Sequence, residues 1–474
     1  MMNLISDEVI KKSNIGFGTS GARGLVTDFT DDVCQAFMCA FIAIMKEQYT
    51  FDQVAIAIDN RPSSYRIAMN CASIAEQFGI KTIYYGVLPT PALAHTALGK
   101  NIPSVMITGS HIPFDRNGLK FYRPDGEITK EDEFKMLSCT CVFEKAESLP
   151  DMQASEEAAE NYCQRYISLF NTSILSGKRI GIYEHSSAGR ELYGKIFSSL
   201  GAEVISLGRS NEFVPIDTEA VSEDDRVKAR IWSEKYKFDA IFSTDGDGDR
   251  PLVADEKGCW LRGDILGLLC ADVLNIEAVA VPVSCNSSIE LSHKFKKVQR
   301  TRIGSPYVIE AFKPLKNVFE SVAGFEANGG FILGSDTFFN QNRISALPTR
   351  DAVLPALMLF YAACTTPISQ ILQSLPARFT FSDRIKDFLA SKSSQIIIDA
   401  VAKPNEFLKR IGIDNREVKI IDQTDGARFS LDNGDIIHLR PSGNAPELRF
   451  YAEAGSESQA QIYVQNGLSL LATM

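Results

Sequence analysis

"KRIGIYEHSSAGRELYGKIFSSLGAEVISLG", residues 178–208, decides how this chain of 474 residues is organised. An apolar run at 179–183 has the length and composition of a buried strand, and a polar turn follows it. Apolar residues then recur at helical spacing before a second apolar run at 203–207. Strand, turn, helix and strand in this order are typical of a β-α-β unit. The stretch therefore predicts an α/β domain.

Two further segments repeat this order. Residues 51–60, "FDQVAIAIDN", read as a buried strand, and a helical pattern over about 64–78 leads to a second strand. Residues 278–304, "AVAVPVSCNSSIELSHKFKKVQRTRIG", show the same succession. In two of the units, glycines flank the second strand at the same separation: Gly79 and Gly86, and Gly201 and Gly208. The chain is therefore predicted to contain three related α/β domains.

The carboxyl-terminal part has a different pattern. From about residue 365 onward, the sequence predicts a helix near 384–410, strands within 417–443 and a closing helix at 456–471. The expected fold is three related α/β domains with mixed sheets plus a smaller C-terminal α+β domain around a central cleft. The expected domain boundaries are 1–150, 151–256, 257–368 and 369–474.

The bulk composition limits the partners. The formal net charge is −10 and the pI is near 5.2. Because positive surfaces hold phosphate polymers and anionic membranes, we expect no nucleic-acid or membrane partner. The longest apolar run, at 353–364, is shorter than the roughly 18 residues of a membrane span, and the amino terminus lacks the pattern of a secretory signal. We expect a cytoplasmic protein with ten reduced cysteines that lie in its core.

Each α/β unit leads into a short strand and a polar, glycine-rich loop. Loops at the carboxyl ends of strands collect ligands in open α/β sheets. In "TDGDGDR", residues 244–250, Asp245, Asp247 and Asp249 alternate with glycines that let the backbone wrap around one cation. Three carboxylates repel one another unless a cation is present, and Mg²⁺ suits oxygen ligands. The loop predicts a magnesium site, with a structural acidic turn as the alternative.

The loop "TGSHIPFDRNGLKFY", residues 108–122, sets Ser110 beside His111. It lacks the G-x-S-x-G motif of hydrolases, and an immediate neighbour is poorly placed to act as a base in an extended segment. An acyl-enzyme serine is therefore not expected. Given a magnesium loop and a separate phosphate site, we interpret the Ser110 hydroxyl as the carrier of a phosphoryl group. An ordinary loop serine is the alternative.

Three other loops carry candidate binding residues. "NIGFGTSGARG", residues 14–24, contains G-x-G-x-x-G without a preceding strand, which argues against a dinucleotide site. It favours a turn that places Arg23 in the cleft, with a plain flexible turn as the alternative. "GFEANGG", residues 324–330, offers Glu326 and Asn328, whose oxygen and amide atoms suit sugar hydroxyls. "RPSGNAPELR", residues 440–449, combines charged and backbone donors for a phosphate, with a plain turn as the alternative: Arg440, Ser442, Gly443, Asn444 and Arg449.

Together, in this order and over essentially the whole length, these motifs resemble those of the α-D-phosphohexomutases, the phosphomannomutase and phosphoglucomutase group. By this resemblance Ser110 in "TGSHIP" is a phosphoserine. The Ser110 phosphate would hold Mg²⁺ together with the three aspartates of residues 244–250, called the metal loop below: Asp245, Asp247 and Asp249. Arg250, which follows them, would reach the reacting phosphate.

The resemblance also implies roles for other residues. His111 matches the histidine beside the phosphoserine. Arg23 and Lys120 match residues that assist charge stabilisation and proton transfer. Glu326 matches the acceptor of sugar hydroxyls, with Asn328 next to it in the same loop. Four residues match the loop that holds the phosphate that is not transferred: Arg440, Ser442, Gly443 and Asn444.

The implied activity is that of an isomerase which interconverts hexose 1-phosphate and hexose 6-phosphate, with mannose and/or glucose as the sugar. Phosphoserine would give its phosphate to the sugar, and a hexose 1,6-bisphosphate would turn over in the cleft and return its other phosphate. The resemblance thus implies Mg²⁺ and hexose 1,6-bisphosphate as cofactor and activator, a phosphosugar as the partner, and a monomer or homodimer.

Some positions depart from the family pattern and leave the sugar open. Many members have serine and histidine where this chain has Asn328 and Gly330. Ser305 stands where histidine or aspartate is frequent, and Asn444 where threonine is common. A phosphoglucosamine mutase is one alternative. A haloacid-dehalogenase-type phosphatase with Asp245 as nucleophile, or a catalytically inactive sugar-phosphate sensor, belongs to another class.

Overall fold

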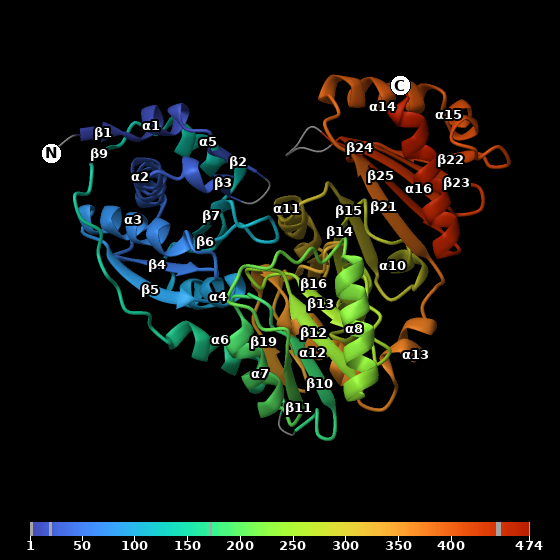
Figure 1. The fold of residues 1–474 in the computed structure, drawn as a ribbon, viewed down its shortest axis with the longest axis horizontal. Helices are drawn as coiled ribbons and strands as arrows, with labels where there is room; N and C mark the ends of the chain where they lie inside the picture. Colours follow the sequence, from blue (N-terminus) through green and yellow to red (C-terminus); the bar gives the residue numbers. More distant parts are fainter. Residues whose placement is uncertain (1–2, 19–20, 171–172, 442–446, 474) are drawn as a thin grey trace.

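The computed structural model of the chain describes residues 3–18, 21–170, 173–441 and 447–473. Its described residues form four sheets of four or more strands. In Figure 1 the amino-terminal elements, in blue, lie on the left, and the green to orange elements fill the centre and bottom. The carboxyl-terminal elements, in red, lie at the upper right.

The first sheet has the strand order β2-β3-β7-β6-β4-β5, and β8 pairs with β7. Its strands are β2 (Gly16–Phe17), β3 (Ala22–Leu25), β4 (Gln53–Ile58), β5 (Lys81–Val87), β6 (Ser104–Ile107), β7 (Arg116–Arg123) and β8 (Gly126–Glu127). The helices of this unit are α1 (Ser6–Lys12), α2 (Asp31–Gln48), α3 (Ser64–Gln77), α4 (Thr90–Lys100) and α5 (Lys130–Ser138), with a short 3-10 turn at Val26–Asp28. Outside the sheet, β1 (Asn3–Ile5) pairs with β9 (Val142–Glu144).

The second sheet has the order β11-β10-β12-β13. Its strands are β10 (Arg179–Tyr183), β11 (Glu203–Leu207), β12 (Ala240–Thr244) and β13 (Pro251–Ala254). The helices are α6 (Glu157–Ile167), α7 (Arg190–Ser199) and α8 (Glu223–Tyr236). Helix α8 begins where the Ser222 hydroxyl accepts a hydrogen bond from the Asp225 amide at 3.2 Å, which satisfies one of the free amides of the first turn.

The third sheet has the order β15-β14-β16-β17-β20. Its strands are β14 (Ala278–Pro282), β15 (Lys297–Thr301), β16 (Val322–Phe325), β17 (Phe331–Leu333) and β20 (Leu347–Asp351), and a hairpin of β18 (Thr337–Phe339) and β19 (Asn342–Ile344) lies before β20. The helices are α9 (Gly263–Val273), α10 (Ser288–Leu291), α11 (Ser305–Lys316), α12 (Val353–Ala362) and α13 (Ile368–Gln373).

The three sheets repeat one arrangement of four strands. The orders β5-β4-β6-β7, β11-β10-β12-β13 and β15-β14-β16-β17 each place the first strand between the second and the third, both parallel to it. In each, the fourth strand returns antiparallel beside the third. The predicted α/β fold with mixed sheets is confirmed. The flanking glycines all have positive φ, which glycine adopts without strain: Gly79, Gly86, Gly201 and Gly208.

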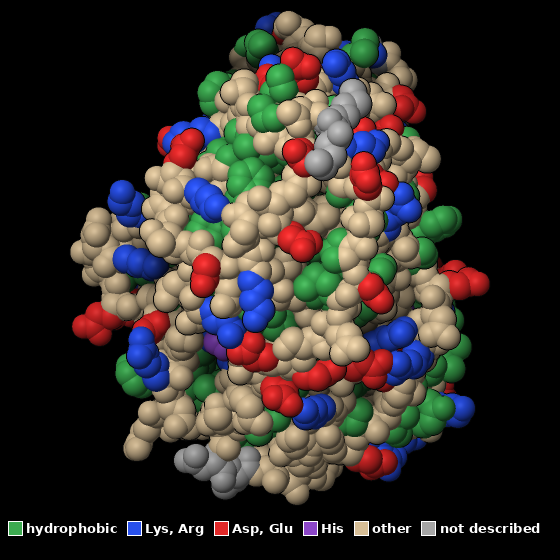
Figure 2. Space-filling view, turned by 90° about the vertical axis from the view of Figure 1, so that its left-hand side faces the viewer, with side chains coloured by type: hydrophobic (Ala, Val, Ile, Leu, Met, Phe, Trp, Pro, Cys, Tyr) green, Lys and Arg blue, Asp and Glu red, His purple; other side chains and the backbone are tan. Residues whose placement is uncertain are grey.

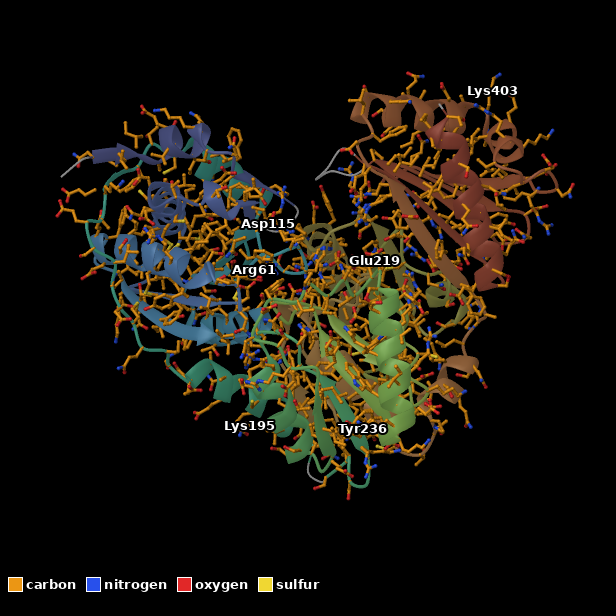
Figure 3. All side chains as sticks on the ribbon, viewed as in Figure 1. Arg61, Asp115, Lys195, Glu219, Tyr236 and Lys403 are labelled. Carbon is orange, nitrogen blue, oxygen red and sulfur yellow. The ribbon has the colours of Figure 1, made fainter. Side chains whose placement is uncertain are left out.

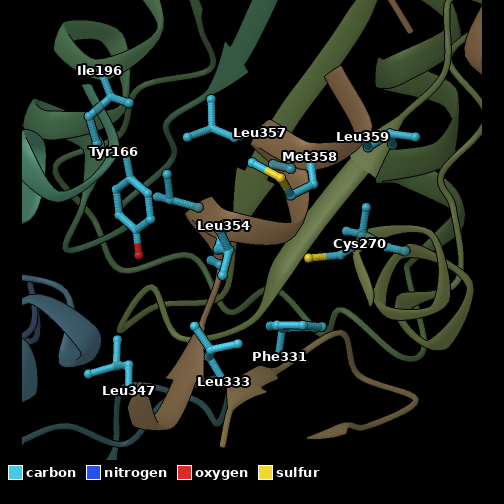
Figure 4. Close-up of a cluster of buried hydrophobic side chains, with 14 of the residues drawn as sticks. Tyr166, Ile196, Cys270, Phe331, Leu333, Leu347, Leu354, Leu357, Met358 and Leu359 are labelled. Atoms are coloured by element: carbon cyan, nitrogen blue, oxygen red, sulfur yellow. The ribbon is translucent and has the colours of Figure 1, made fainter. Parts of the chain in front are cut away.

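One continuous apolar core joins the three units. It contains buried side chains from all of them, among them Leu93, Phe242 and Leu357. Helix α12 lies at its centre, and Figure 4 shows Leu354, Leu357 and Met358 of this helix beside buried residues of the neighbouring elements. The apolar run at 353–364 is therefore a core helix. Separate apolar clusters cover the opposite faces of the three sheets.

The carboxyl-terminal unit is an antiparallel sheet of order β21-β25-β24-β23-β22. Its strands are β21 (Phe379–Ile385), β22 (Val418–Asp422), β23 (Ala427–Leu431), β24 (Ile436–Pro441) and β25 (Leu448–Ala454). The helices are α14 (Ala390–Ala402), α15 (Pro404–Arg410) and α16 (Glu457–Ala472). Its buried apolar residues form a core of their own. This is the smaller α+β unit expected from the sequence.

Two predicted elements differ in detail. The helix expected near 384–410 is a strand up to Ile385 and then two helices, because Pro404 lacks the amide that would continue α14. The predicted helix of the third unit is α10, a single turn of four residues. The four domain boundaries stay predictions; the one after residue 368 falls at the first residue of α13.

The cysteines and the surface have simple properties. Six of the ten cysteines are buried as expected, but Cys259 is exposed, and none forms a disulfide. Among the described helices, none has both the length and the apolar character needed to cross a membrane. On the face that Figure 2 shows, acidic and basic side chains alternate over the surface.

A buried carboxylate ties the second unit to the third. Asp351, at the end of β20, accepts a hydrogen bond of 2.6 Å from the Tyr162 hydroxyl and another from Tyr166. Both tyrosines lie on one face of α6 and are fully buried. Burial raises the pKa of each tyrosine well above its usual value, and the charge of Asp351 adds to this. The two hydroxyls therefore remain donors, and they fix the position of β20.

We predict that Asp351→Ala lowers the free energy of unfolding by about 2–5 kcal/mol, because two buried hydroxyls lose their acceptor. The measurement is thermal and urea denaturation followed by circular dichroism. The variant Asp351→Ala/Tyr162→Phe/Tyr166→Phe should regain part of this loss, since both partners are then apolar. Equal stability of wild type and Asp351→Ala would contradict the prediction.

Candidate active site

Three loops that were singled out in the sequence occupy the same position in the repeated arrangement. Each connects the third strand to the antiparallel fourth strand: residues 108–115 between β6 and β7, 245–250 between β12 and β13, and 326–330 between β16 and β17. They leave the carboxyl ends of strands, where open α/β sheets bind ligands. The structure brings the three loops together.

Ser110 lies at the centre of the first loop and is fully buried. Its φ is +54°, a left-handed conformation that is strained for a residue with a side chain. Its hydroxyl donates to Asp245 Oδ2 at 2.7 Å and lies 3.3 Å from His111 Nδ1. Its amide donates to the Thr108 hydroxyl at 2.8 Å. The predicted phosphate carrier is thus in direct contact with the predicted metal loop.

Arg61, in the loop after β4, holds this strained conformation in place. Its guanidinium donates to Asp59 Oδ2 at 3.0 Å and to four carbonyl oxygens of the Ser110 loop: Ser110 (2.9 Å), Ile112 (2.5 Å), Pro113 (2.7 Å) and Arg116 (3.1 Å). These five acceptors use all five N–H donors of an arginine. The Phe213 ring of the second unit stacks on the guanidinium at 3.9 Å. Figure 3 labels Arg61 and, on the same loop as Ser110, Asp115.

Glycine 109 leaves room for this arginine. A Cβ atom at residue 109 would lie 2.6 Å from Arg61 Cζ, closer than real Cβ contacts. Gly246 of the metal loop makes a similar close approach, because a Cβ there would lie 2.6 Å from the Ser110 carbonyl oxygen. Gly109 therefore lets the Arg61 guanidinium lie against the Ser110 loop, and Gly246 lets the metal loop pack against the backbone of that loop.

Asp245, Asp247 and Asp249 are fully buried, and one oxygen of each lies within 4.8 Å of the others. Lys120 Nζ, on β7, donates to Oδ2 of Asp247 and, at 2.7 Å, to Oδ2 of Asp249. The remaining oxygens, Oδ1 of Asp247 and of Asp249, have no hydrogen-bond partner in the described part of the chain. Buried carboxylate oxygens without donors fit a cation, so this group could hold a metal ion.

The pKa values of the aspartates follow from their partners. Burial, and then the charges of the other two carboxylates, raise the pKa of Asp245 well above its usual value. Burial would also raise the pKa of Asp247, but the Lys120 ammonium and the Thr90 hydroxyl lower it overall. Burial acts in the same way on Asp249, whose pKa the Arg350 guanidinium and Lys120 lower. Like charges are therefore crowded here, as expected of a site for a cation.

His111 and Arg250 lie together above Ser110. Arg250 Nη1 lies 3.1 Å from His111 Nδ1, so this nitrogen is the acceptor and the ring is neutral. Burial, and then the charge of Arg250, lower the pKa of His111 to about 3. Arg23, on β3, is another positive residue near His111, and burial followed by the charges of Arg250 and Arg350 lowers the pKa of Arg23 to about 10.

The sugar-binding candidate Glu326 is buried and directly follows β16. Its Oε2 lies 3.3 Å from Arg350 Nη1. Asn328 is fixed by its neighbours, because its Oδ1 accepts from the Gly330 amide at 3.0 Å and its carbonyl oxygen accepts from the Thr218 hydroxyl at 2.7 Å. Its amide nitrogen is thus the part of the side chain available for a ligand.

The predicted phosphate loop is described in part. Ser442, Gly443 and Asn444 lie outside the described residues. Arg440, at the end of β24, is half-buried, and its Nε donates to Asp425 Oδ2 at 2.9 Å. Asp425 Oδ2 also accepts from the Ile303 amide at 3.0 Å, which connects this arginine to the third unit.

A cavity of about 590 Å³ lies between the four units. It is lined by the predicted residues Arg23, His111, Arg250, Glu326, Asn328, Arg440 and Arg449, and by Asp217, Glu219, Arg350 and Arg384, which were not predicted as site residues. Glu219 lies at the centre of Figure 3. Ser110, Lys120 and the three aspartates do not line this cavity themselves. Ser110, Asp245 and Asp249 contact its lining residues His111, Arg250 and Arg350, respectively, and Lys120 contacts Asp247 and Asp249 behind them.

Sequence reasoning missed two arginines that organise the site. Arg61 follows a predicted strand in "DNRPSS", the kind of position where site residues collect, and this signal could have found it. Arg350 lies at the end of an edge strand, and no local pattern distinguishes it. Both act through acceptors that are distant in the sequence.

Comparison with known proteins identifies the family. The chain matches three family models: phosphoglucomutase/phosphomannomutase alpha/beta/alpha domain I over residues 14–140, domain III over 262–379 and the C-terminal domain over 391–466. It is 58% identical over 462 residues to a phosphomannomutase of Salmonella muenchen, with 98% of this chain and 96% of the relative covered. The chain belongs to the phosphoglucomutase/phosphomannomutase family.

Other members of this family are more distant. A phosphomannomutase of Sinorhizobium fredii is 40% identical over 470 residues, covering 96% of this chain and 98% of the relative. A phosphoglucosamine mutase of Delftia acidovorans is 25% identical over 461 residues, covering 94% and 95%. A solved structure of a phosphoglucomutase/phosphomannomutase family protein from Burkholderia thailandensis shares the fold, with a TM-score of 0.74, 17% identity and 96% of both chains covered.

Family membership confirms the predicted family, the α/β fold class and the enzyme class, an isomerase that acts as a mutase. It does not favour a phosphatase or an inactive sensor. The roles of the single site residues stay predictions, which the following experiments test.

We predict that Arg61→Met loosens the Ser110 loop, because Asp59 loses its counter-charge and four carbonyls lose the guanidinium that holds them together. Loss of one partner of a buried ion pair costs about 3–5 kcal/mol of stability. Hydrogen exchange followed by mass spectrometry should show that residues 108–116 exchange faster in Arg61→Met than in wild type, by a larger factor than the rest of the first sheet.

The matched control is Arg61→Lys, which keeps the charge but has three donors instead of five. It should fold better than Arg61→Met and still show faster exchange in the loop. Unchanged exchange in both variants would show that the loop holds its shape without the guanidinium.

Proposed function

We propose that this chain interconverts hexose 1-phosphate and hexose 6-phosphate, with mannose and glucose phosphates as substrates. The reaction would pass through a phosphoserine at Ser110 and a hexose 1,6-bisphosphate. The single observation that carries the proposal is the 2.7 Å contact of the Ser110 hydroxyl with Asp245, in a buried group of three carboxylates. The names of the relatives support the same reaction.

We infer that Asp245, Asp247 and Asp249 hold Mg²⁺ together with the phosphate on Ser110. The two unpartnered Oδ1 atoms support this, because they are hard oxygen ligands that no protein donor satisfies in the described residues. When bound, Mg²⁺ would neutralise part of the charge of the phosphate, which carries about −1.5 to −2 at neutral pH.

Residues of the chain would carry out the other parts of the phosphoryl transfer. Ser110 gives its phosphoryl group to the free hydroxyl oxygen of the sugar: the bond from phosphorus to Ser110 Oγ breaks as the bond to the sugar oxygen forms. Arg250 and Arg23 supply positive charge near the transferred group. Lys120 holds Asp247 and Asp249 in place through their Oδ2 atoms.

Glu326, with Asn328, would accept and donate hydrogen bonds at the sugar hydroxyls. Arg440 would hold the phosphate that is not transferred, together with Ser442, Gly443 and Asn444. These four residues are called the phosphate grip below. The bisphosphate must present either end to Ser110, so the reaction is helped when the phosphate grip lies on a unit that can move as a body because it has its own apolar core. The cytoplasmic location, the lack of a nucleic-acid partner and a monomeric or homodimeric state remain proposals from the sequence.

The experiment that tests the proposal is a phosphorus NMR time course with Mg²⁺ and a trace of glucose 1,6-bisphosphate. Mannose 1-phosphate, glucose 1-phosphate and glucosamine 1-phosphate are offered in parallel. We expect a 6-phosphate from the first two, and a loss of about 10³-fold or more in kcat for Ser110→Ala, which removes the phosphate carrier. Release of inorganic phosphate would indicate a phosphatase, and preference for the amino sugar a phosphoglucosamine mutase.

We predict that Arg440→Ala mainly raises KM. Loss of a charged hydrogen-bonded contact is worth about 1.5–3 kcal/mol, which corresponds to a KM roughly 10- to 150-fold higher. Steady-state kinetics with mannose 1-phosphate measure this effect. The matched control is Arg343→Ala, an exposed arginine of the β18–β19 hairpin paired with Asp336. A kcat that falls while KM stays unchanged would argue against a binding role for Arg440.

A further inference from the structure

Arg350 connects the metal loop of the second unit to the sugar loop of the third. Its Nε and Nη2 donate to Asp249 Oδ2 at 3.1 and 2.9 Å, and its Nη1 lies 3.3 Å from Glu326 Oε2. The side chains of all three residues are 4% exposed or less. One buried guanidinium thus joins two carboxylates of different loops.

Each of these carboxylates gives one oxygen to Arg350 and keeps the other. Asp249 Oδ2 is held by Arg350 and Lys120, whereas its Oδ1 accepts no hydrogen bond from the described residues. Glu326 Oε2 faces Arg350, and Glu326 itself lines the cavity. Asp249 Oδ1, with Arg250 Nε at 3.7 Å, is thus the oxygen left for a cation, and Glu326 is held by Arg350 at the wall of the cavity.

The position of Arg350 is fixed by its surroundings. Its neighbour Asp351 is anchored by the hydroxyls of Tyr162 and Tyr166, so the end of β20 has a defined place. The stem of Arg350 fills the space beside Gly330, where a Cβ atom would lie 2.3 Å from Arg350 Cδ and 2.7 Å from Cγ. No side chain fits at residue 330 while Arg350 is there, so the glycine and the arginine form a matched pair.

We propose that Arg350 is a positioning residue that couples the cation site to the sugar site, an inference that rests on the function proposed above. A cation bound at Asp249 neutralises part of the negative charge of that carboxylate. It thereby weakens the ion pair between Asp249 and Arg350. Arg350 then interacts more strongly with Glu326. Because such coupling is reciprocal, a change at Glu326 alters the affinity of the cation site.

The first test measures this coupling without turnover. Binding of Mn²⁺, as a spectroscopic substitute for Mg²⁺, is followed by electron paramagnetic resonance in wild type, Glu326→Gln, Arg350→Met and the double variant. In wild type, removal of the Glu326 charge leaves Arg350 with Asp249 alone, which lowers cation affinity. We expect Glu326→Gln to weaken Mn²⁺ binding about fivefold when Arg350 is present, and less than about twofold in the Arg350→Met background.

An equal fold-change in both backgrounds would overturn the proposal, because the effect of Glu326 would then reach the cation without Arg350. Thermal denaturation shows which variants fold. If Arg350→Met does not fold, the same cycle with Arg350→Lys decides, since lysine keeps the charge but cannot reach both carboxylates with a planar fork.

The second test uses kinetics and the matched variants Arg350→Lys and Arg440→Lys. We expect Arg350→Lys to raise both the KM for mannose 1-phosphate and the Mg²⁺ concentration for half-maximal activity, each at least threefold. Arg440→Lys, in the phosphate grip, should raise the KM and leave the Mg²⁺ requirement within about twofold. An equal change in the Mg²⁺ concentration for half-maximal activity in both variants would overturn the proposal that Arg350 couples the two sites.

These experiments separate the two proposals. If wild type shows no interconversion of hexose phosphates, the proposed function fails, and the Mn²⁺ cycle still decides whether Arg350 couples the two carboxylates. If wild type is an active mutase and the cycle shows no coupling, the function stands and the role of Arg350 fails.

Discussion

Three buried carboxylates in one turn of chain are the constraint on which the rest of the structure depends. A buried charge without a counter-charge costs several kcal/mol, and the metal loop contains three buried carboxylates within five residues. Its own unit supplies Arg250, at 3.7 Å from Asp249. The other counter-charges come from elsewhere: Lys120 from the first unit and Arg350 from the third. The charge balance of the metal loop therefore requires three units to assemble.

The repeated topology explains why this assembly is possible. The connection from the third to the fourth strand is the same in each sheet, and it carries a hydroxyl in the first unit, carboxylates in the second and a hydrogen-bond acceptor in the third. One fold thus supplies three chemical functions at equivalent places, and the shared apolar core holds the three sheets in a fixed relation. Precise placement of reacting groups needs such rigid support.

The sequence contains enough to predict the loops but not what holds them. Ser110, Asp245 and Glu326 stand in glycine-rich, polar loops after short strands, and this local pattern is sufficient to select them as candidates. Arg61 and Arg350 are single arginines in ordinary surroundings. Their importance depends on acceptors about 50 to 100 residues away, such as Ser110 for Arg61, which no local pattern contains.

Secondary structure likewise divides into features that the local sequence predicts and features that it does not. The strands and most helices follow from apolar periodicity, and the positive φ of the flanking glycines agrees with their repeated spacing. The short helix α10 and the break before α15 were not anticipated, although Pro404 gives a local signal for the break. Burial of α12 depends on three units packing around it, so its sequence alone gives only an apolar run.

The carboxyl-terminal unit differs from the others in how it is attached. Its apolar core is separate, and its contacts with the third unit include polar ones: Ser287 with Glu453, Arg302 with the Thr424 carbonyl, and the Ile303 amide with Asp425. Polar contacts exchange with water at a smaller cost than apolar ones, so such an interface opens more easily than the shared core. Asp425 also holds Arg440, so the arginine of the phosphate grip and the contact between the units share one carboxylate. Arg440 and Asp425 belong to the same unit, so a phosphate that draws Arg440 away from Asp425 breaks no contact between units. It changes the partners of the carboxylate that accepts the Ile303 amide, and so links ligand binding at this end of the cavity to the contact with the third unit.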